Sequence, residues 1–141
     1  MRGEVILLTR RIKLSLCQIY LTGNSSTNIT YVEILGTFCH SYHPIIKISG
    51  LLGEFRMIGS SLRMEDTTRE GSGIEISNFS NSGAEIRICK NNLYGPFTGT
   101  GILLKTSANI TLTENWLFNV RPYDSKYSIG LAVLQGSSII I

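Results

Sequence analysis

The chain has 141 residues, of which 43% are hydrophobic and 16% are charged, and its formal net charge is +3. This balance predicts one globular domain and excludes an intrinsically disordered chain. The basic residues are scattered, with Arg10 and Arg11 as the densest point, so the charge pattern does not predict nucleic-acid binding. No apolar run reaches the roughly 18 residues that cross a bilayer, and none near the N-terminus resembles a signal-peptide core. We therefore expect no membrane contact by this segment itself.

The first part of the chain contains two predicted strands, Val5–Leu8 and Ile12–Leu14. Asn24–Thr30 follows as a predicted polar loop, although its end, from Asn28 onward, already resembles the strands of the later repeats. Phe55–Ile58 is predicted as an additional strand in a region whose register stays open. The N-terminal portion, residues 1–44, is thus predicted to be less regular than residues 45–141.

The later part of the chain repeats two short patterns. The first pattern, apolar-x-apolar-x-x-polar, begins at Leu62, Ile86 and Ile110, which are equally spaced along the chain. The second recurs at nearly equal intervals, and its copies are Ile46–Ser49, Ile74–Ser77, Ile102–Leu104 and Leu131–Val133. Short strands at regular intervals, with Gly, Ser and Asn at the corners, are typical of a solenoid.

The sequence therefore predicts an all-β fold, a right-handed parallel β-helix of about five coils in a single domain, 1–141. Equivalent apolar residues of successive coils would stack into interior columns about 4.8 Å apart. Three columns are predicted: Leu62, Ile86, Ile110 and Ile139; Met64, Ile88, Leu112 and Ile141; and Ile48, Ile76, Leu104 and Val133. The competing fold is an antiparallel sandwich, which the regular intervals disfavour. The last repeat stops midway, so we expect a fragment that is incomplete at both ends and prone to aggregate.

Four Asn-x-Ser/Thr sequons, at Asn24, Asn28, Asn78 and Asn109, favour an extracellular glycoprotein. The chain has 3 cysteines, Cys17, Cys39 and Cys89, an odd number without paired spacing. We interpret the cysteines as small buried hydrophobic residues, and their disulfide state stays open.

An aromatic group is the candidate binding platform. Trp116 and Phe118 are two residues apart, and Tyr94 would lie over Phe118 one coil earlier. Together they could receive a sugar ring or a partner protein, and packing in the core or at a corner is the alternative interpretation. Asn91 and Asn115, with Thr67 below them, would form a structural hydrogen-bonding ladder where the chain bends.

Catalytic and metal-binding residues are not predicted. The outward positions of the first pattern offer no stacked carboxylates of the kind that two-carboxylate glycoside hydrolysis needs, and Glu65 with Asp66 is interpreted as a solvated turn. Cys39, His40 and His43 are residue types that bind zinc. A zinc site needs four ligands, however, and the sequence has no second cluster of cysteine and histidine. We expect no cofactor and no metal.

The segment RGEVILLTRRIKL, Arg2–Leu14, resembles a phrase shared by the β-helix regions of fibrocystin, fibrocystin-L and the related cell-surface hyaluronidases. The positions that match are Glu4, Val5, Leu7, Leu8, Thr9, Arg10 and Ile12, whereas Arg11 stands where the family pattern has Asn. The histidine-containing segment of the hyaluronidase branch has only a degenerate counterpart, Ser41–Ile48, which lacks the histidine pair.

The resemblance implies the extracellular face of a single-pass membrane protein, ciliary or secreted. Two functions remain as hypotheses. The first is a non-catalytic, glycosylated β-helix segment of a fibrocystin-like receptor that binds a protein or glycan ligand on the side of the solenoid. The second is a remnant of a β-helix enzyme that processes hyaluronan-like polysaccharides.

Overall fold

The computed structural model of the chain describes eleven stretches, which contain only β-strands as regular structure. These stretches are 5–9, 13–16, 18–22, 26–37, 43–50, 54–65, 71–79, 85–106, 108–121, 129–134 and 138–140. The strands, in chain order, are β1 (Val5–Thr9), β2 (Lys13–Leu16), β3 (Ile19–Thr22), β4 (Ser26–Thr30), β5 (Glu33–Gly36), β6 (Ile46–Ser49), β7 (Phe55–Ile58), β8 (Ser61–Met64), β9 (Ile74–Phe79), β10 (Glu85–Cys89), β11 (Asn92–Thr98), β12 (Thr100–Thr106), β13 (Asn109–Thr113), β14 (Trp116–Arg121), β15 (Ile129–Leu134) and β16 (Ser138–Ile140).

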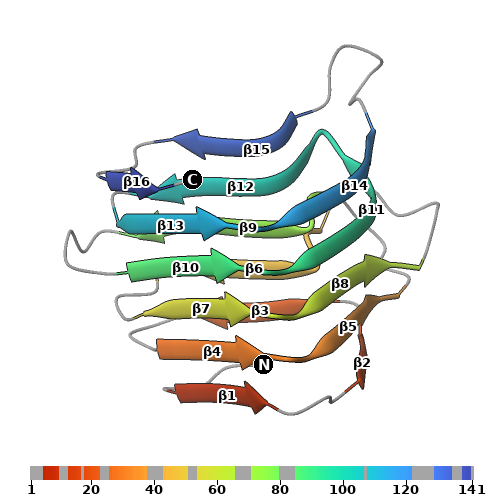
Figure 1. The fold of residues 1–141 in the computed structure, drawn as a ribbon, viewed down its shortest axis with the longest axis horizontal. Coiled ribbons are helices and arrows are strands. Elements are labelled where there is room, and N and C mark those ends of the chain that lie inside the picture. The colour runs from red at the N-terminus through yellow and green to blue at the C-terminus, as the bar shows by residue number, and fades with distance from the viewer. Residues whose placement is uncertain are drawn as a thin grey trace.

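The strands form three parallel sheets, and the chain visits them in rotation. Sheet A has the order β1-β4-β7-β10-β13-β16, sheet B the order β14-β11-β8-β5-β2, and sheet C the order β15-β12-β9-β6-β3. In Figure 1 the chain crosses the front in sheet A, turns up the right side in sheet B, and returns behind in sheet C. The chain runs from left to right across the front and from right to left behind, and it rises by one level in each circuit. This sense of rotation is right-handed.

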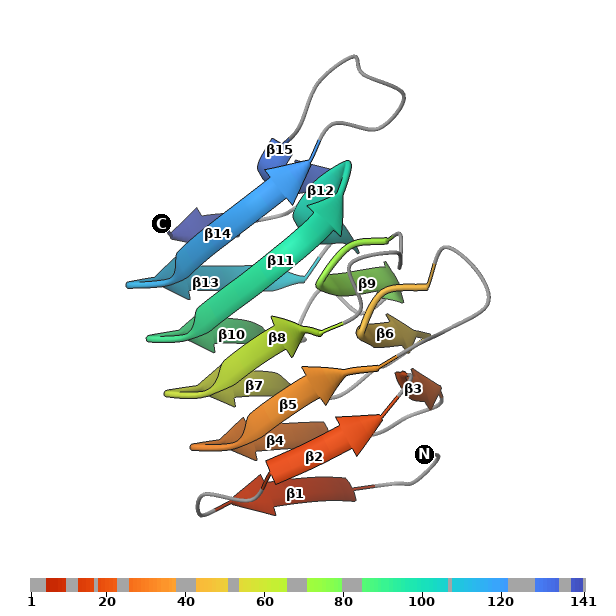
Figure 2. The ribbon, with the colours of Figure 1, turned by 90° about the vertical axis from the view of Figure 1, so that its right-hand side faces the viewer.

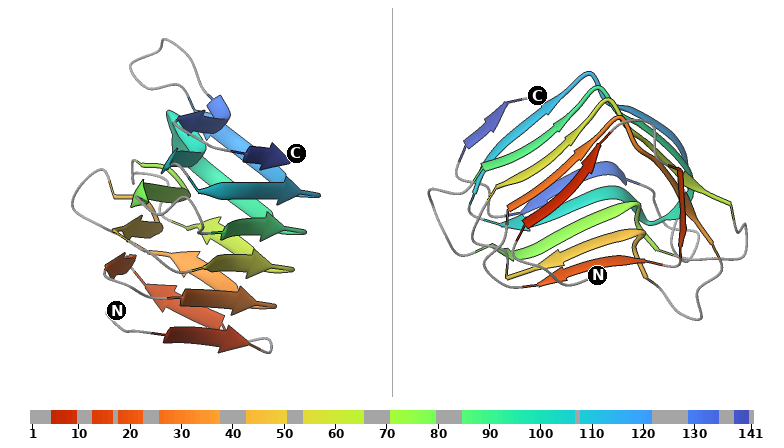
Figure 3. Two further views of the ribbon diagram at one scale, coloured as in Figure 1. Left: turned by 90° about the vertical axis from the view of Figure 1, so that its left-hand side faces the viewer. Right: turned by 90° about the horizontal axis from the view of Figure 1, so that it is seen from below.

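Five successive coils, each with one strand per sheet, are followed by β16. The side view of sheet B and the view along the stack show the three faces surrounding one interior (Figures 2 and 3). The predicted right-handed parallel β-helix of about five coils is therefore confirmed. The antiparallel sandwich is wrong, because every strand pair in the described part of the chain is parallel.

The interior consists of stacked apolar columns, because alternate side chains point inward in the strands whose burial is described. The predicted column of sheet C is confirmed by its register, which places Ile48, Ile76, Leu104 and Val133 on successive strands. Ile110 likewise lies between Ile86 and Ile139 in sheet A. The inward residues of the described core, such as Ile48 and Ile86, have essentially no exposed surface.

The placement of Leu62 and Met64 in the sheet A columns is wrong. Both residues lie in β8 of sheet B, where Leu62 pairs with Leu93 and Ile34. Below Ile86 and Ile88 of sheet A lie Phe55 and Met57 instead. Ile141, the last predicted member of the second column, lies outside the described residues.

Two further predictions also need revision. The predicted strand Val5–Leu8 lies in β1, and Lys13 and Leu14 of the next predicted strand lie in β2, whereas Ile12 lies outside the described residues. Most of the predicted loop Asn24–Thr30 is strand β4, which carries the buried residues Thr27 and Ile29 in its interior-facing positions. The predicted strand Phe55–Ile58 is confirmed as β7, but it is a regular member of sheet A and not an additional strand. The strands before residue 45 therefore enter the same three sheets as those after it.

The corner between sheets A and B has the same construction in four coils. Its first residue has a positive φ: 54° at Tyr31, 61° at Gly59, 57° at Lys90 and 54° at Glu114. This left-handed conformation turns the chain sharply within the two residues that separate the strands. The corner amides bond to the next coil, as when the Lys90 N–H donates to the Thr113 carbonyl at 2.9 Å.

A polar ladder stabilises the same corner from inside. The Asn91 amide nitrogen donates to the Met57 carbonyl at 2.8 Å and to the Asn115 side-chain oxygen at 3.0 Å. The Asn91 side-chain oxygen accepts from the Ser60 N–H at 2.9 Å, and the Ser60 hydroxyl accepts from the Val32 N–H at 3.1 Å. The predicted Asn91 and Asn115 ladder is thus confirmed, with Ser60 below it. Thr67, the predicted third member, lies outside the described residues.

Candidate functional site

The predicted aromatic platform lies on the outer face of sheet B. Tyr94 of β11 is the register partner of Phe118 of β14, and their rings stack with centroids 4.9 Å apart and planes 8° apart. Trp116 lies two residues before Phe118 on the same side of β14, with ring centroids 6.3 Å apart. Because strand alternation sends all three outward, Trp116 is 64% exposed and Phe118 is 41% exposed. The alternative interpretation, packing in the core or at a corner, does not fit this exposure.

Arg63 extends the platform by one coil. It precedes Tyr94 in the same outward column, and its guanidinium carbon lies 5.5 Å from the centre of the Tyr94 ring. A cation over an aromatic face is attracted by the negative charge of that face. The series from Arg63 through Tyr94 to Phe118 is therefore an ordered stack along the axis of the solenoid.

A groove of about 790 Å³ runs along the corner between sheets A and B, beside this platform. No sequence motif indicates it directly. It is lined by Tyr31, Val32, Glu33, Gly59, Ser60, Ser61 and Asn92. The Tyr31 ring, on a residue that is 61% exposed, lies over Gly59, where an added Cβ would be 2.6 Å from the ring. The outward residues Glu33, Ser61 and Asn92 begin successive strands of sheet B and form its floor.

Asn92 connects the groove to the platform, because its register partner on the next strand is Trp116. Sequence reasoning missed Glu33, Ser61 and Asn92 because they are unequally spaced: the step from Glu33 to Ser61 is shorter than the step from Ser61 to Asn92. Two residues always precede the sheet B strand in these coils, whatever the length of the coil. Counting from this two-residue corner would have aligned Glu33, Ser61 and Asn92.

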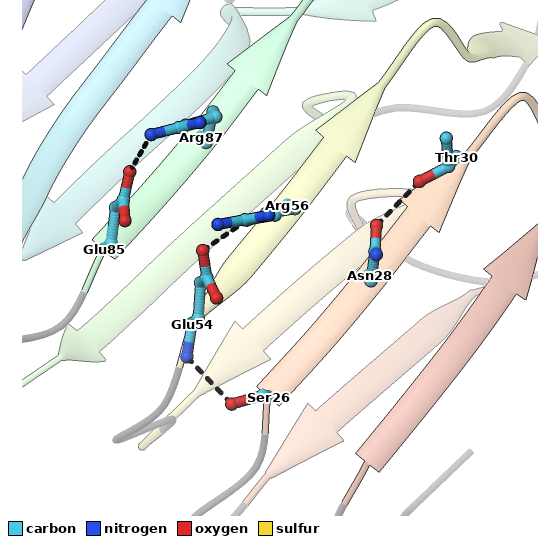
Figure 4. Close-up of polar contacts among 7 residues, drawn as sticks. All are labelled: Ser26, Asn28, Thr30, Glu54, Arg56, Glu85 and Arg87. Carbon is cyan, nitrogen blue, oxygen red and sulfur yellow. Dashed lines mark hydrogen bonds and ion pairs between the residues drawn. The ribbon is translucent and has the colours of Figure 1, made fainter.

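The outer face of sheet A carries a second polar group, drawn in Figure 4. Glu54 forms an ion pair with Arg56, and Glu85 forms one with Arg87 on the adjacent strand. The Glu54 N–H also donates to the Ser26 hydroxyl at 3.2 Å, one coil lower. Since Phe55 and Ile86 are register partners, the two carboxylates that precede them occupy equivalent outward positions.

The expectation that no carboxylates stack in adjacent coils is therefore wrong, because Glu54 and Glu85 do so. It failed because the strand at Phe55 was not aligned with the strand at Ile86. Glu65, the residue that directly follows β8, is exposed to solvent, and Asp66 lies outside the described residues. The side chains of the two ion pairs, Glu54 with Arg56 and Glu85 with Arg87, are only partly exposed, by between 36% and 40%.

The four sequons fall on different parts of the solenoid. Asn109 is exposed at the start of β13, and Asn28 is half-buried in β4, where its side-chain oxygen accepts from the Thr30 hydroxyl at 2.7 Å. Both project from sheet A, below and above the strands that carry the ion pairs. Asn78 belongs to β9 of sheet C. Asn24 lies outside the described residues.

Cysteine and histidine form no metal centre in the described part of the chain, where no group of three or more potential metal ligands occurs. His43 is half-buried, and Cys39 and His40 lie outside the described residues. Cys89 is a buried free thiol in β10, as interpreted from the sequence, whereas Cys17 and Cys39 are not described. The described residues also contain no helix long and apolar enough to cross a membrane.

Comparison of the chain with protein-family models, curated proteins and solved structures finds no match. The resemblance of Arg2–Leu14 to the fibrocystin phrase therefore stays a prediction. The stacked aromatic rings and the adjoining groove are the geometric features from which a function can be argued.

Proposed function

We propose that the chain is a non-catalytic β-helix segment of an extracellular, membrane-anchored protein similar to fibrocystin. Its role is to present a rigid, glycosylated surface to a protein or glycan ligand on the side of the solenoid. The observation that supports this role best is the exposed aromatic platform of Tyr94, Trp116 and Phe118 on sheet B. Exposed aromatic rings are enriched at binding sites because they offer a large apolar area at a small cost in conformational entropy.

The scaffold beneath the platform favours binding without rearrangement. Leu93 is completely buried on the strand that carries Tyr94, and Leu117 packs against the core between Trp116 and Phe118. Hydrogen bonds on both sides of β11 hold its backbone. A ligand therefore meets rings that are already ordered, which reduces the entropy lost on association.

The glycan acceptors support a division of roles between faces. Asn28 and Asn109 belong to sheet A, whereas the platform belongs to sheet B. Glycans attached at these two positions would cover the face with the ion pairs and leave the aromatic face accessible. Mass spectrometry of the protein from a secretory host should find glycan at Asn109, and an unmodified Asn109 would contradict the extracellular assignment.

Binding by the platform is testable with arrays of glycans and of extracellular protein domains. We expect the intact chain to bind components of one array, and Trp116→Ser combined with Phe118→Ser to abolish that binding. Glu75→Gln, on the outward side of sheet C, is the control and should bind as the native chain does. Binding that survives the double substitution, or no binding to either array, would contradict the proposed function.

Polysaccharide processing is the second candidate, and the stacked carboxylates Glu54 and Glu85 favour it. Strand spacing of about 4.8 Å is close to the roughly 5–5.5 Å between the carboxyl groups of retaining glycosidases. Each carboxylate, however, is neutralised by an arginine on its own strand. We expect no cleavage of hyaluronan. Cleavage that disappears in both Glu54→Gln and Glu85→Gln would establish the second candidate instead.

A further inference from the structure

The corner groove and the aromatic platform adjoin each other along the solenoid axis, because Asn92 of the groove is the register partner of Trp116. The first outward column of sheet B runs from Glu33 through Ser61 and Asn92 to Trp116, and each residue is the register partner of the next. At about 4.8 Å per strand, the three steps of this column span roughly 14 Å. Tyr31 stands at the lower end and Trp116 at the upper end, and both are mostly exposed.

The chemistry of the column matches a carbohydrate. The carboxylate of Glu33, the hydroxyl of Ser61 and the amide of Asn92 can each exchange hydrogen bonds with the neighbouring hydroxyl groups of a sugar. The rings of Tyr31 and Trp116 offer apolar faces to the C–H side of a pyranose. An extended pyranose chain advances by a distance similar to one coil, so successive sugars can meet successive strands.

The charge of the groove selects among glycans. Its described lining residues include one carboxylate, that of Glu33, and no cation. Lys90 lies at the same corner one coil above Gly59, and its charge is paired with that of Glu114 at 3.9 Å. Arg63 lies in the next column, where its guanidinium is positioned over the Tyr94 ring. A polyanionic glycan bound along the groove would place its own carboxylates next to the carboxylate of Glu33. Neighbouring charges of the same sign repel each other.

We propose that this surface, from Tyr31 to Trp116, is a binding site for a neutral oligosaccharide that lies extended along the solenoid axis. The site spans three to four sugars. Tyr31 and Trp116 stack on its ends, and Glu33, Ser61 and Asn92 hydrogen-bond its middle. The inference rests on the proposed binding function, and it specifies the ligand class and the residues of the floor.

The test uses the intact chain and reads the fluorescence of Trp116, which is the sole tryptophan among its 141 residues. The probes are the hexasaccharides of chitin, cellulose and mannan, and a hyaluronan hexasaccharide. At least one neutral probe should change the emission in a saturable manner, and hyaluronan should bind about tenfold more weakly or not at all. Equal or tighter binding of hyaluronan, or no response to any neutral probe, would overturn the inference.

Substitutions in the floor of the groove separate this site from the platform alone. Asn92→Ala should weaken the neutral probe about tenfold through loss of its hydrogen bonds. Glu33→Lys should weaken the neutral probe and strengthen hyaluronan, whereas Glu75→Lys on sheet C is the matched control and should change neither. If the floor substitutions have no effect while the double substitution at Trp116 and Phe118 still abolishes array binding, the groove is refuted and the proposed function remains.

Discussion

Replacement of Asn91 by alanine should destabilise the whole solenoid, because this side chain connects three coils. The side chain is completely buried and takes part in three hydrogen bonds, to the Met57 carbonyl, the Asn115 side chain and the Ser60 N–H. Alanine would leave the Ser60 N–H buried without its acceptor. An orphaned buried donor costs about 1–3 kcal/mol, and each remaining lost hydrogen bond costs about 1 kcal/mol. We expect a loss of about 3–5 kcal/mol in the free energy of unfolding.

The measurement is urea unfolding of the native chain and the variant, followed by circular dichroism. The midpoint should fall with an unchanged slope, and the melting temperature should fall by about 10–15 °C. Asn92→Ala is the matched control, because the neighbouring amide is exposed and points outward. Its unfolding free energy should stay within about 0.5 kcal/mol of the native value.

A double-mutant cycle with Asn115→Ala tests whether the ladder acts as a unit. The two amides share a hydrogen bond of 3.0 Å, so their effects should be non-additive by about 1 kcal/mol. A loss at Asn91 no larger than that of the Asn92 control, or strictly additive effects, would refute the structural role assigned to the ladder.

The same unfolding assay checks two further matched pairs. Thr27→Val should stabilise the chain by about 1 kcal/mol, because the Thr27 hydroxyl is buried without a hydrogen-bond partner in the described structure. Thr106→Val should instead cost about 1–3 kcal/mol, since that buried hydroxyl accepts a backbone N–H at 3.1 Å, and equal effects would contradict the reasoning. Gly59→Ala and Gly50→Ala should each cost about 1–2 kcal/mol, because both positions have a left-handed backbone. Only Gly59→Ala should shift the ring resonances of Tyr31, and unchanged resonances would refute the contact between them.

The fold was predictable because apolar side chains recur at equivalent positions. The repeat of Ile48, Ile76 and Leu104 identified sheet C correctly, since its strands follow one another at equal intervals there. Leu62 was misassigned because strands of all three sheets share the same apolar alternation. An interval between two such strands does not reveal which sheet either belongs to.

The binding surface was predictable only in part. Trp116 and Phe118 were recognisable because bulky aromatic residues alternate on one strand, and their pairing with Tyr94 followed from the constant interval of the first pattern. Glu33 carries no such signal, because an outward glutamate on a strand is ordinary. Glu33 becomes part of a site only because the corner places Tyr31 and Gly59 beside it. That placement depends on the positive φ angles of the corner, which cannot be read from the sequence.

The uniform corner between sheets A and B has a consequence for protein engineering. Two residues join these sheets in each of the four later coils, whereas the links from sheet B to sheet C range from one residue to nine. Foreign peptides or whole domains should therefore be tolerated at the variable links and should disrupt folding at the corner. Inserted groups could then be displayed at steps of about 4.8 Å along the solenoid, a spacing that the strand pairing keeps constant whatever the links contain.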